Sequence, residues 1–167
     1  MDVILEQWRR ERPDLDLSPI GVFGRIAQLT GLLGPPVEAV LTRHGLDAGE
    51  FDVLTTLRRA GAPCRPSQLS DLLMMSRAGM TSRLDRLERA GWIERQLDPA
   101  DRRSLRITLT EAGRAVIDAT LTEHAANLAR LIAPLEASEV RALEDGLRRL
   151  ILALTGPGLA DPGQGAG

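Results

Sequence analysis

Two helical segments followed at once by a strand pair constrain the fold of this chain more than any other feature. The stretch covers residues 65–113. Pro66 stands at a helix-start position, and the apolar residues behind it are expected to bury one face of a first helix: Leu69, Leu72, Leu73 and Met75. Ser76 then suits the N-cap of a second helix, which Gly91 ends. That helix too has one apolar face, formed by residues within about 60° of one another: Met80, Leu84 and Leu87.

The opposite side of the second helix carries side chains that suit a DNA major groove. They are small, hydroxylated or cationic: Ala78, Thr81, Ser82, Arg86 and Arg89. Small residues permit close approach, arginine can bridge guanine O6 and N7, and serine or threonine can reach bases or phosphates. Together with Ser76 and Arg77 at the helix start, they are our candidate DNA contacts. A solvated helix face has a similar composition, so this helix alone does not decide the function.

The strand pair after this helix favours DNA binding. Residues 92–96 and 104–109 are predicted strands, and the second alternates strictly, with three residues expected to point inward: Leu105, Ile107 and Leu109. The loop between the strands carries Arg102 and Arg103 at its tip, where guanidinium groups can lie along a minor groove or phosphates. Asp101 is expected to orient one of the arginines. The alternative is an ordinary charged hairpin tip, but with the helix pair we interpret the whole stretch as a winged helix-turn-helix.

The same stretch and its flanks resemble the MarR family of bacterial transcription regulators, over about residues 18–154. The resemblance rests on the helix pair together with Leu46, Phe51-Asp52-Val53-Leu54, Asp101-Arg102-Arg103 and Leu109-Thr110-Glu111-Ala112-Gly113. It implies a mainly α fold with a small β-wing, a DNA-binding lobe at about residues 47–110 and an interlocked helical homodimer. It also implies a palindromic operator and a small-molecule ligand that releases the DNA.

Composition and charge limit the other possibilities. At 167 residues with 43% hydrophobic content, the chain can bury one sizeable core. No run approaches the roughly 20 apolar residues of a membrane span, and the amino terminus lacks signal-peptide order, so we expect a cytoplasmic protein. Net charge is −2, but residues 65–106 hold nine arginines against six acids, which is +3 locally and leaves −5 elsewhere. The basic segment is therefore the expected DNA face.

The flanking segments are helical by pattern. Helices are expected at residues 22–46 with a break near Pro35, at 47–59, from a Thr110 cap to about residue 131, and at 137–154. A domain this small cannot cover the apolar faces of the last two helices, so we expect a second protomer to complete the core. The Gly/Pro-rich tail, residues 155–167, is expected to be disordered.

An added amino-terminal segment, residues 1–17, suggests a ligand site. Its Trp8 and the matches at Asp52, Arg83 and Arg95 resemble the urate-responsive subgroup of the MarR family. Arg83 lies about 60° from the apolar centre of the second helix, so it can reach either a pocket or DNA. Arg95 shares a strand face with Ile93, which directs its charge inward and calls for an anionic partner, either Asp52 or a ligand. Our hypothesis is that a small anionic aromatic ligand such as urate binds Arg95, stacks on Trp8, displaces Asp52 and acts through Arg83.

Several alternatives stay open from the sequence. Trp8 can merely hold the first helix down while the three charged residues form a buried salt-bridge network, and the ligand can instead be phenolic or a tricarboxylate. Cys64, the single cysteine, excludes an internal disulfide but can serve as a redox switch if a nearby arginine favours its thiolate. His44 and His124 can take part in metal sensing. No phosphate loop or nucleophile-base set indicates an enzyme, no cofactor is expected, and a sequence-tolerant architectural DNA protein needs a more basic surface.

Overall fold

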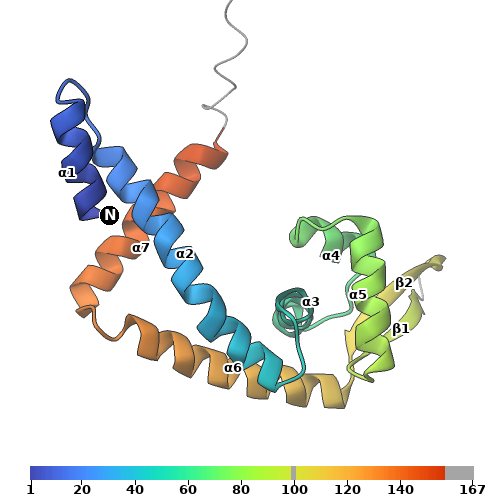
Figure 1. Ribbon diagram of the computed structural model, residues 1–167. Coiled ribbons are helices and arrows are strands. Elements are labelled where there is room, and N and C mark those ends of the chain that lie inside the picture. Colours follow the sequence, from blue (N-terminus) through green and yellow to red (C-terminus); the bar gives the residue numbers. More distant parts are fainter. Residues whose placement is uncertain (99–100, 157–167) are drawn as a thin grey trace, which may run out of the picture. The chain divides into compact units, whose positions relative to one another are not determined.

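The computed structural model describes residues 1–98 and 101–156, without the side chains of residues 101–103. This part of the chain forms seven α-helices and one two-stranded antiparallel sheet (Figure 1). In chain order they are α1 (Asp2–Glu11), α2 (Ser18–Arg43), α3 (Ala48–Ala60), α4 (Pro66–Leu72), α5 (Arg77–Arg89), β1 (Ile93–Asp98), β2 (Asp101–Leu109), α6 (Glu111–Ile132) and α7 (Ala137–Thr155). Two compact units meet inside α6, between residues 127 and 128. The expected tail, from residue 157 on, lies outside the described residues.

The core of the first unit gathers apolar side chains from the end of α2, from α3, α4 and α5, from both strands and from the start of α6. Its most buried members include Val53, Leu54, Leu69, Leu87, Ile107 and Ile117. Helix α3 begins in a capping box: the Glu50 amide donates to Asp47 Oδ1 at 2.8 Å, and the Asp47 amide donates to Glu50 Oε2 at 2.9 Å. These bonds satisfy amides that the first turn of a helix leaves open. The predicted mainly α fold with a small β-wing is confirmed.

Helices α4 and α5 form the predicted helix-turn-helix. Ser76 caps α5, since its Oγ accepts a hydrogen bond from the Gly79 amide at 3.1 Å. The expectation that Leu72 lies on the buried face is wrong, because its side chain is 64% exposed. Helix α4 is only two turns long, and its inner face follows Leu69 and Leu73, which lie closer together around the helix than Leu69 and Leu72 do.

The wing is longer than the two predicted strands. Ile93 pairs with Leu109, Arg95 with Ile107 and Leu97 with Leu105. Ile107 and Leu109 are buried as expected, but Leu105 is 40% exposed, so its predicted inward position is wrong. The physical reason is that only the base of the hairpin lies on the core. Farther out, the paired residues Leu97 and Leu105 extend past the helices into solvent.

Helix α2 runs without a break through Pro35 and Pro36, so the predicted interruption is wrong. The two prolines remove two amide donors, but the turns on both sides keep theirs, and Asn127 Nδ2 of α6 donates to the Pro36 carbonyl at 3.1 Å. Helix α6 begins where predicted, because Thr110 Oγ1 accepts from the Gly113 amide at 3.0 Å. At the other end of α2, α1 packs through the buried Leu5 beside Gly21.

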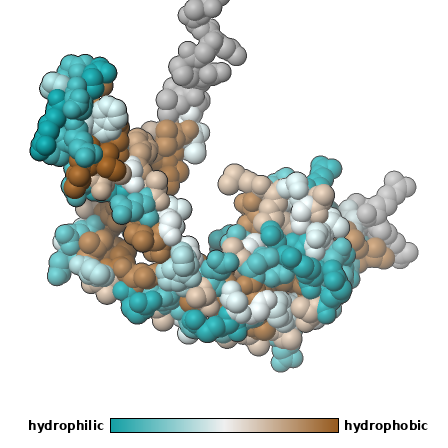
Figure 2. Space-filling view, in the orientation of Figure 1, coloured by the Kyte–Doolittle hydropathy of each residue, from teal (hydrophilic) through white to brown (hydrophobic). Residues whose placement is uncertain are grey.

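Large apolar side chains are left uncovered on the helices outside the helix-turn-helix and wing (Figure 2). On α2 they include Phe23 and Leu32, which are 52% and 65% exposed. In the second unit, they lie along α7: Leu143, Leu147, Ile151, Leu152 and Leu154. No helix in the described part of the chain combines the length and the apolar character needed to span a membrane.

Candidate nucleic-acid interface

The outer face of α5 carries most of the side chains that the sequence assigned to DNA. Met80, Leu84 and Leu87 are buried, which turns the opposite side of the helix outward and exposes Arg77, Ala78, Thr81, Ser82 and Arg89. Ser76 is engaged as the N-cap, and Thr81 Oγ1 donates to the Arg77 carbonyl at 3.0 Å. A helix with small and cationic residues on one exposed face can lie in a major groove.

Arg86 lies at the edge of this face and contacts α3. Its Nη2 is 2.6 Å from Asp47 Oδ2 and its Nε is 3.1 Å from Glu50 Oε1, so it bridges the two acids of the α3 capping box. The sequence placed Arg86 among the DNA contacts, and it missed Asp47 as a functional neighbour. The position of Asp47 directly before a helical pattern was the available signal, because an N-cap acid lies at the exposed end of its helix.

Arg83 lies between the core and the surface, as its angular position on the helix indicated. Its guanidinium lies over the backbone of Gly49, its Nη1 is 3.2 Å from Met75 Sδ, and its Nε is 3.7 Å from Asp47 Oδ1. Within the described part of the chain, the buried Nε finds no hydrogen-bond acceptor. The nearest carboxylate of Arg83 thus comes from the first turn of α3.

The expected pairing of Arg95 with Asp52 is wrong. Arg95 Nη2 is 2.5 Å from Asp85 Oδ1, and Arg95 Nη1 is 3.4 Å from Glu88 Oε2. Both acids lie on α5, the helix against which β1 packs, so they reach the guanidinium without leaving the surface. Asp52 is exposed on α3.

The four residues proposed for ligand binding do not gather into one site within a single chain. Trp8 is 48% exposed on α1, and Figure 1 shows α1 at the opposite end of α2 from α3. Arg83 contacts α3, whereas Arg95 contacts α5. Next to the charged group, a groove of about 420 Å³ lies between α2 and α3 and includes Asp47 in its wall, with Val37, Leu41 and Leu46.

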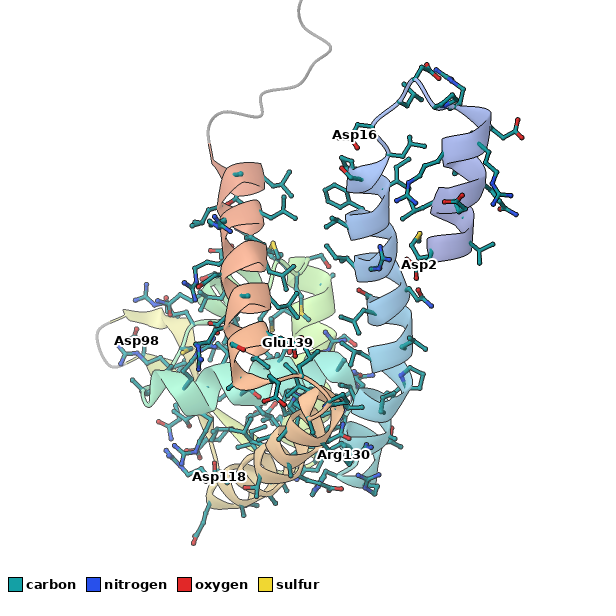
Figure 3. The ribbon with its side chains drawn as sticks, turned by 90° about the vertical axis from the view of Figure 1, so that its left-hand side faces the viewer. Asp2, Asp16, Asp98, Asp118, Arg130 and Glu139 are labelled. Carbon is teal, nitrogen blue, oxygen red and sulfur yellow. The ribbon has the colours of Figure 1, made fainter. Side chains whose placement is uncertain are left out.

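A buried carboxylate at the base of the wing was not anticipated. Asp98 is completely buried at the end of β1 and pairs with Arg65 Nη2 at 3.1 Å and with Arg106 Nη2 at 2.9 Å (Figure 3). The sequence had placed Asp98 in the loop. Two arginines outside the recognition helix were the available signal, but only the fold brings them together. The side chains of Asp101, Arg102 and Arg103 lie outside the described residues.

Cys64 and the two histidines have other surroundings than a switch or a metal site. Cys64 is buried, its backbone pairs with Ile107 of β2, and burial raises the pKa of its thiol. The suggestion that a nearby arginine favours its thiolate is therefore wrong. His44 Nε2 is 2.8 Å from Glu123 Oε2, and the His124 ring packs against Phe51 with centroids 5.1 Å apart. Across residues 1–98 and 101–156 no group of three or more histidine, cysteine or acidic side chains is placed to hold a metal ion.

Comparison with known proteins finds one family throughout. The family model for the MarR family matches residues 46–105. The HTH-type transcriptional regulator PecS of Dickeya dadantii is 43% identical over 145 residues, which cover 84% of this chain and 87% of PecS. Among solved structures, a mutant MarR from E. coli complexed with operator DNA gives a TM-score of 0.68 at 28% identity, covering 80% of this chain and 96% of MarR. AbsC from Streptomyces coelicolor gives a TM-score of 0.74 at 25% identity, covering 84% and 96%.

Proposed function

This chain belongs to the MarR family of DNA-binding transcriptional regulators, and we propose that it binds a palindromic operator as a homodimer and represses transcription until a small ligand releases it. The observation that carries the proposal is the outward face of α5. Arg77, Ala78, Thr81, Ser82 and Arg89 are exposed together beside the wing, on the segment with an excess of three positive charges. Such a face supplies both the phosphate attraction and the base-reading groups that operator binding requires.

The dimer in this proposal is supported by the uncovered apolar residues. On α7, Val140, Leu143, Leu147, Leu150, Ile151 and Leu154 form one stripe at helical spacing. Exposed stripes of this size are characteristic of association surfaces in soluble proteins. A second copy of the chain is the occupant that we propose. A twofold-symmetric dimer presents its two recognition helices in inverted orientation, so its operator is a palindrome.

The ligand that we propose is a small aromatic anion, with urate as the first candidate. Arg83 and Arg86 both contact Asp47, which borders the groove between α2 and α3. An anion in that groove competes with Asp47 for the guanidinium groups of the recognition helix. Arg95 offers a second cation, while the exposed indole of Trp8 can stack on a planar ring. A coupling of roughly 1–3 kcal/mol changes operator affinity by about 5–150-fold.

The test is operator binding with and without ligand. Fluorescence anisotropy at about 150 mM salt compares the chain's own upstream region with a scrambled duplex, because specificity must survive screening. We expect preference for the upstream region and release by urate, with a weaker response in Trp8→Ala. No preference between the duplexes contradicts the regulator, whereas release by a phenolic acid or citrate but not by urate replaces the ligand only.

A further inference from the structure

We propose that Arg65 and Arg106 form a two-arginine clamp for one phosphate of the operator backbone, held in place by the buried carboxylate of Asp98. The inference rests on the proposed function, because its ligand is the phosphodiester of operator DNA. It adds three residues to the DNA-binding surface, none of which lies on the recognition helix.

The three residues come from three elements. Arg65 is the N-cap residue of α4, Asp98 ends β1, and Arg106 lies within β2. One oxygen of Asp98 faces each guanidinium: Oδ2 is 3.1 Å from Arg65 Nη2 and Oδ1 is 2.9 Å from Arg106 Nη2. Asp98 therefore joins the helix-turn-helix to the wing. Figure 3 shows Asp98 at the outer end of the strand pair, next to the grey trace.

Stability alone gives little reason for a carboxylate at this position. Asp98 is completely buried, and removing a carboxylate from water costs several kcal/mol that its partners only offset. Apolar side chains of similar size stabilise such a position equally well. What the carboxylate supplies instead is direction, because charge-assisted hydrogen bonds to each oxygen fix where the two guanidinium groups point.

The two arginines keep a face toward solvent while Asp98 holds them. Their side chains are 49% and 37% exposed, although the carboxylate that they share is at 0%. A guanidinium has five N–H donors in a planar fork, more than one carboxylate oxygen accepts. Two positive charges against one negative charge also leave this group of three residues attractive to an anion. A phosphodiester, with its two unesterified oxygens, matches a pair of neighbouring guanidinium groups.

The sign of one charge change tests the positioning role. Asp98→Asn in the full-length protein adds one positive charge, which by long-range attraction alone tightens DNA binding. We expect the opposite for the operator: affinity about tenfold weaker, as for one lost charge-assisted contact, while binding to a scrambled duplex is unchanged or tighter. The matched control is Glu94→Gln, the same charge change at an exposed residue of the same strand. Glu94 Oε1 accepts from Gln96 Nε2 and Thr108 Oγ1, a role that glutamine can keep.

The arginines are tested by salt dependence. We expect Arg65→Gln and Arg106→Gln each to lower the slope of log K against log salt by about 0.9, the value for one phosphate contact. Both side chains are partly exposed, so these variants carry the test even if Asp98→Asn does not fold, which thermal unfolding reports. Unchanged slopes, or an Asp98→Asn protein that matches Glu94→Gln in operator affinity, overturn the clamp. If the wild type itself shows no duplex preference, the proposed function fails instead.

Discussion

The guanidinium of Arg83 lies directly on the backbone of Gly49. A Cβ atom at residue 49 would come within 2.1 Å of both Arg83 Cζ and Nη1, so only glycine leaves room for this contact. The contact joins the recognition helix α5 to the first turn of α3, where Asp47 is 3.7 Å from Arg83 Nε. A change in the first turn of α3 therefore reaches the helix that we propose to read DNA.

Replacing Gly49 by alanine should move Arg83 at little cost in stability. The colliding atoms are the end of a flexible side chain, and alanine improves helix propensity by about 1 kcal/mol, which offsets part of the cost of displacing it. We expect a small change in melting temperature but a clear change in operator affinity. In a double-mutant cycle with Arg83→Ala, the effects on affinity should not add, because both changes remove the same contact. Additive effects would show that Gly49 acts by another route.

Replacing Gly113 by alanine should destabilise the fold. The new Cβ atom would lie 1.9 Å from the Trp92 carbonyl oxygen, a backbone atom that cannot rotate away. The expected loss in the free energy of unfolding is about 1–3 kcal/mol or more, measured by urea titration. Gly146→Ala in α7 is the matched comparison, since no atom of the described chain lies within 4 Å of its new Cβ. It should gain up to about 1 kcal/mol from helix propensity.

Acid should weaken the contact between α3 and α6. Arg58 donates to both oxygens of Asp118, at 2.7 and 3.1 Å, and thereby lowers the pKa of that carboxyl group. The folded pKa is below the unfolded one, so the contribution is present above the ordinary carboxyl pKa of about 4 and is lost as pH falls through the lowered value. Thermal unfolding between about pH 7 and pH 3 should show a flatter dependence for Asp118→Asn than for the wild type. Parallel curves would assign the acid sensitivity elsewhere, for example to Glu123, whose pKa Arg43 and His44 lower.

Cys64 should react slowly in the native protein. Burial raises the pKa of the thiol, so the thiolate, which is the nucleophile, is scarce at neutral pH. Alkylation by iodoacetamide, followed by intact mass, should be slow in buffer and fast in urea. We also expect Cys64→Ser to keep both operator binding and ligand release. Fast native alkylation together with oxidant-dependent release would support a redox switch.

A charge on the apolar stripe of α7 should dissociate the proposed dimer. Ile151 is 58% exposed and lies on the stripe, whereas its neighbour Leu152 is 63% exposed and lies about 100° away around the helix. We expect Ile151→Glu to give a monomer and Leu152→Glu to stay dimeric in sedimentation velocity. Dissociation of the operator complex should follow only in the first variant. If both variants behave alike, the stripe is not the boundary of the interface.

The sequence alone determined the elements and the faces of the DNA-binding part. Local patterns sufficed for this: Ser76 and Thr110 as N-caps, the spacing of Met80, Leu84 and Leu87, and the intermediate position of Arg83. Such features depend on residues within one or two turns of each other. Helix geometry converts their spacing directly into direction.

Tertiary structure alone decided which charges meet and which apolar residues are covered. Arg95 pairs with Asp85 and Glu88 rather than with Asp52, because β1 packs against α5. Asp98 is buried because a helix start and a second strand each bring an arginine to it, and Leu105 is exposed because the wing extends past the core. Ion pairs between elements depend on how those elements pack, and sequence spacing carries no record of that packing.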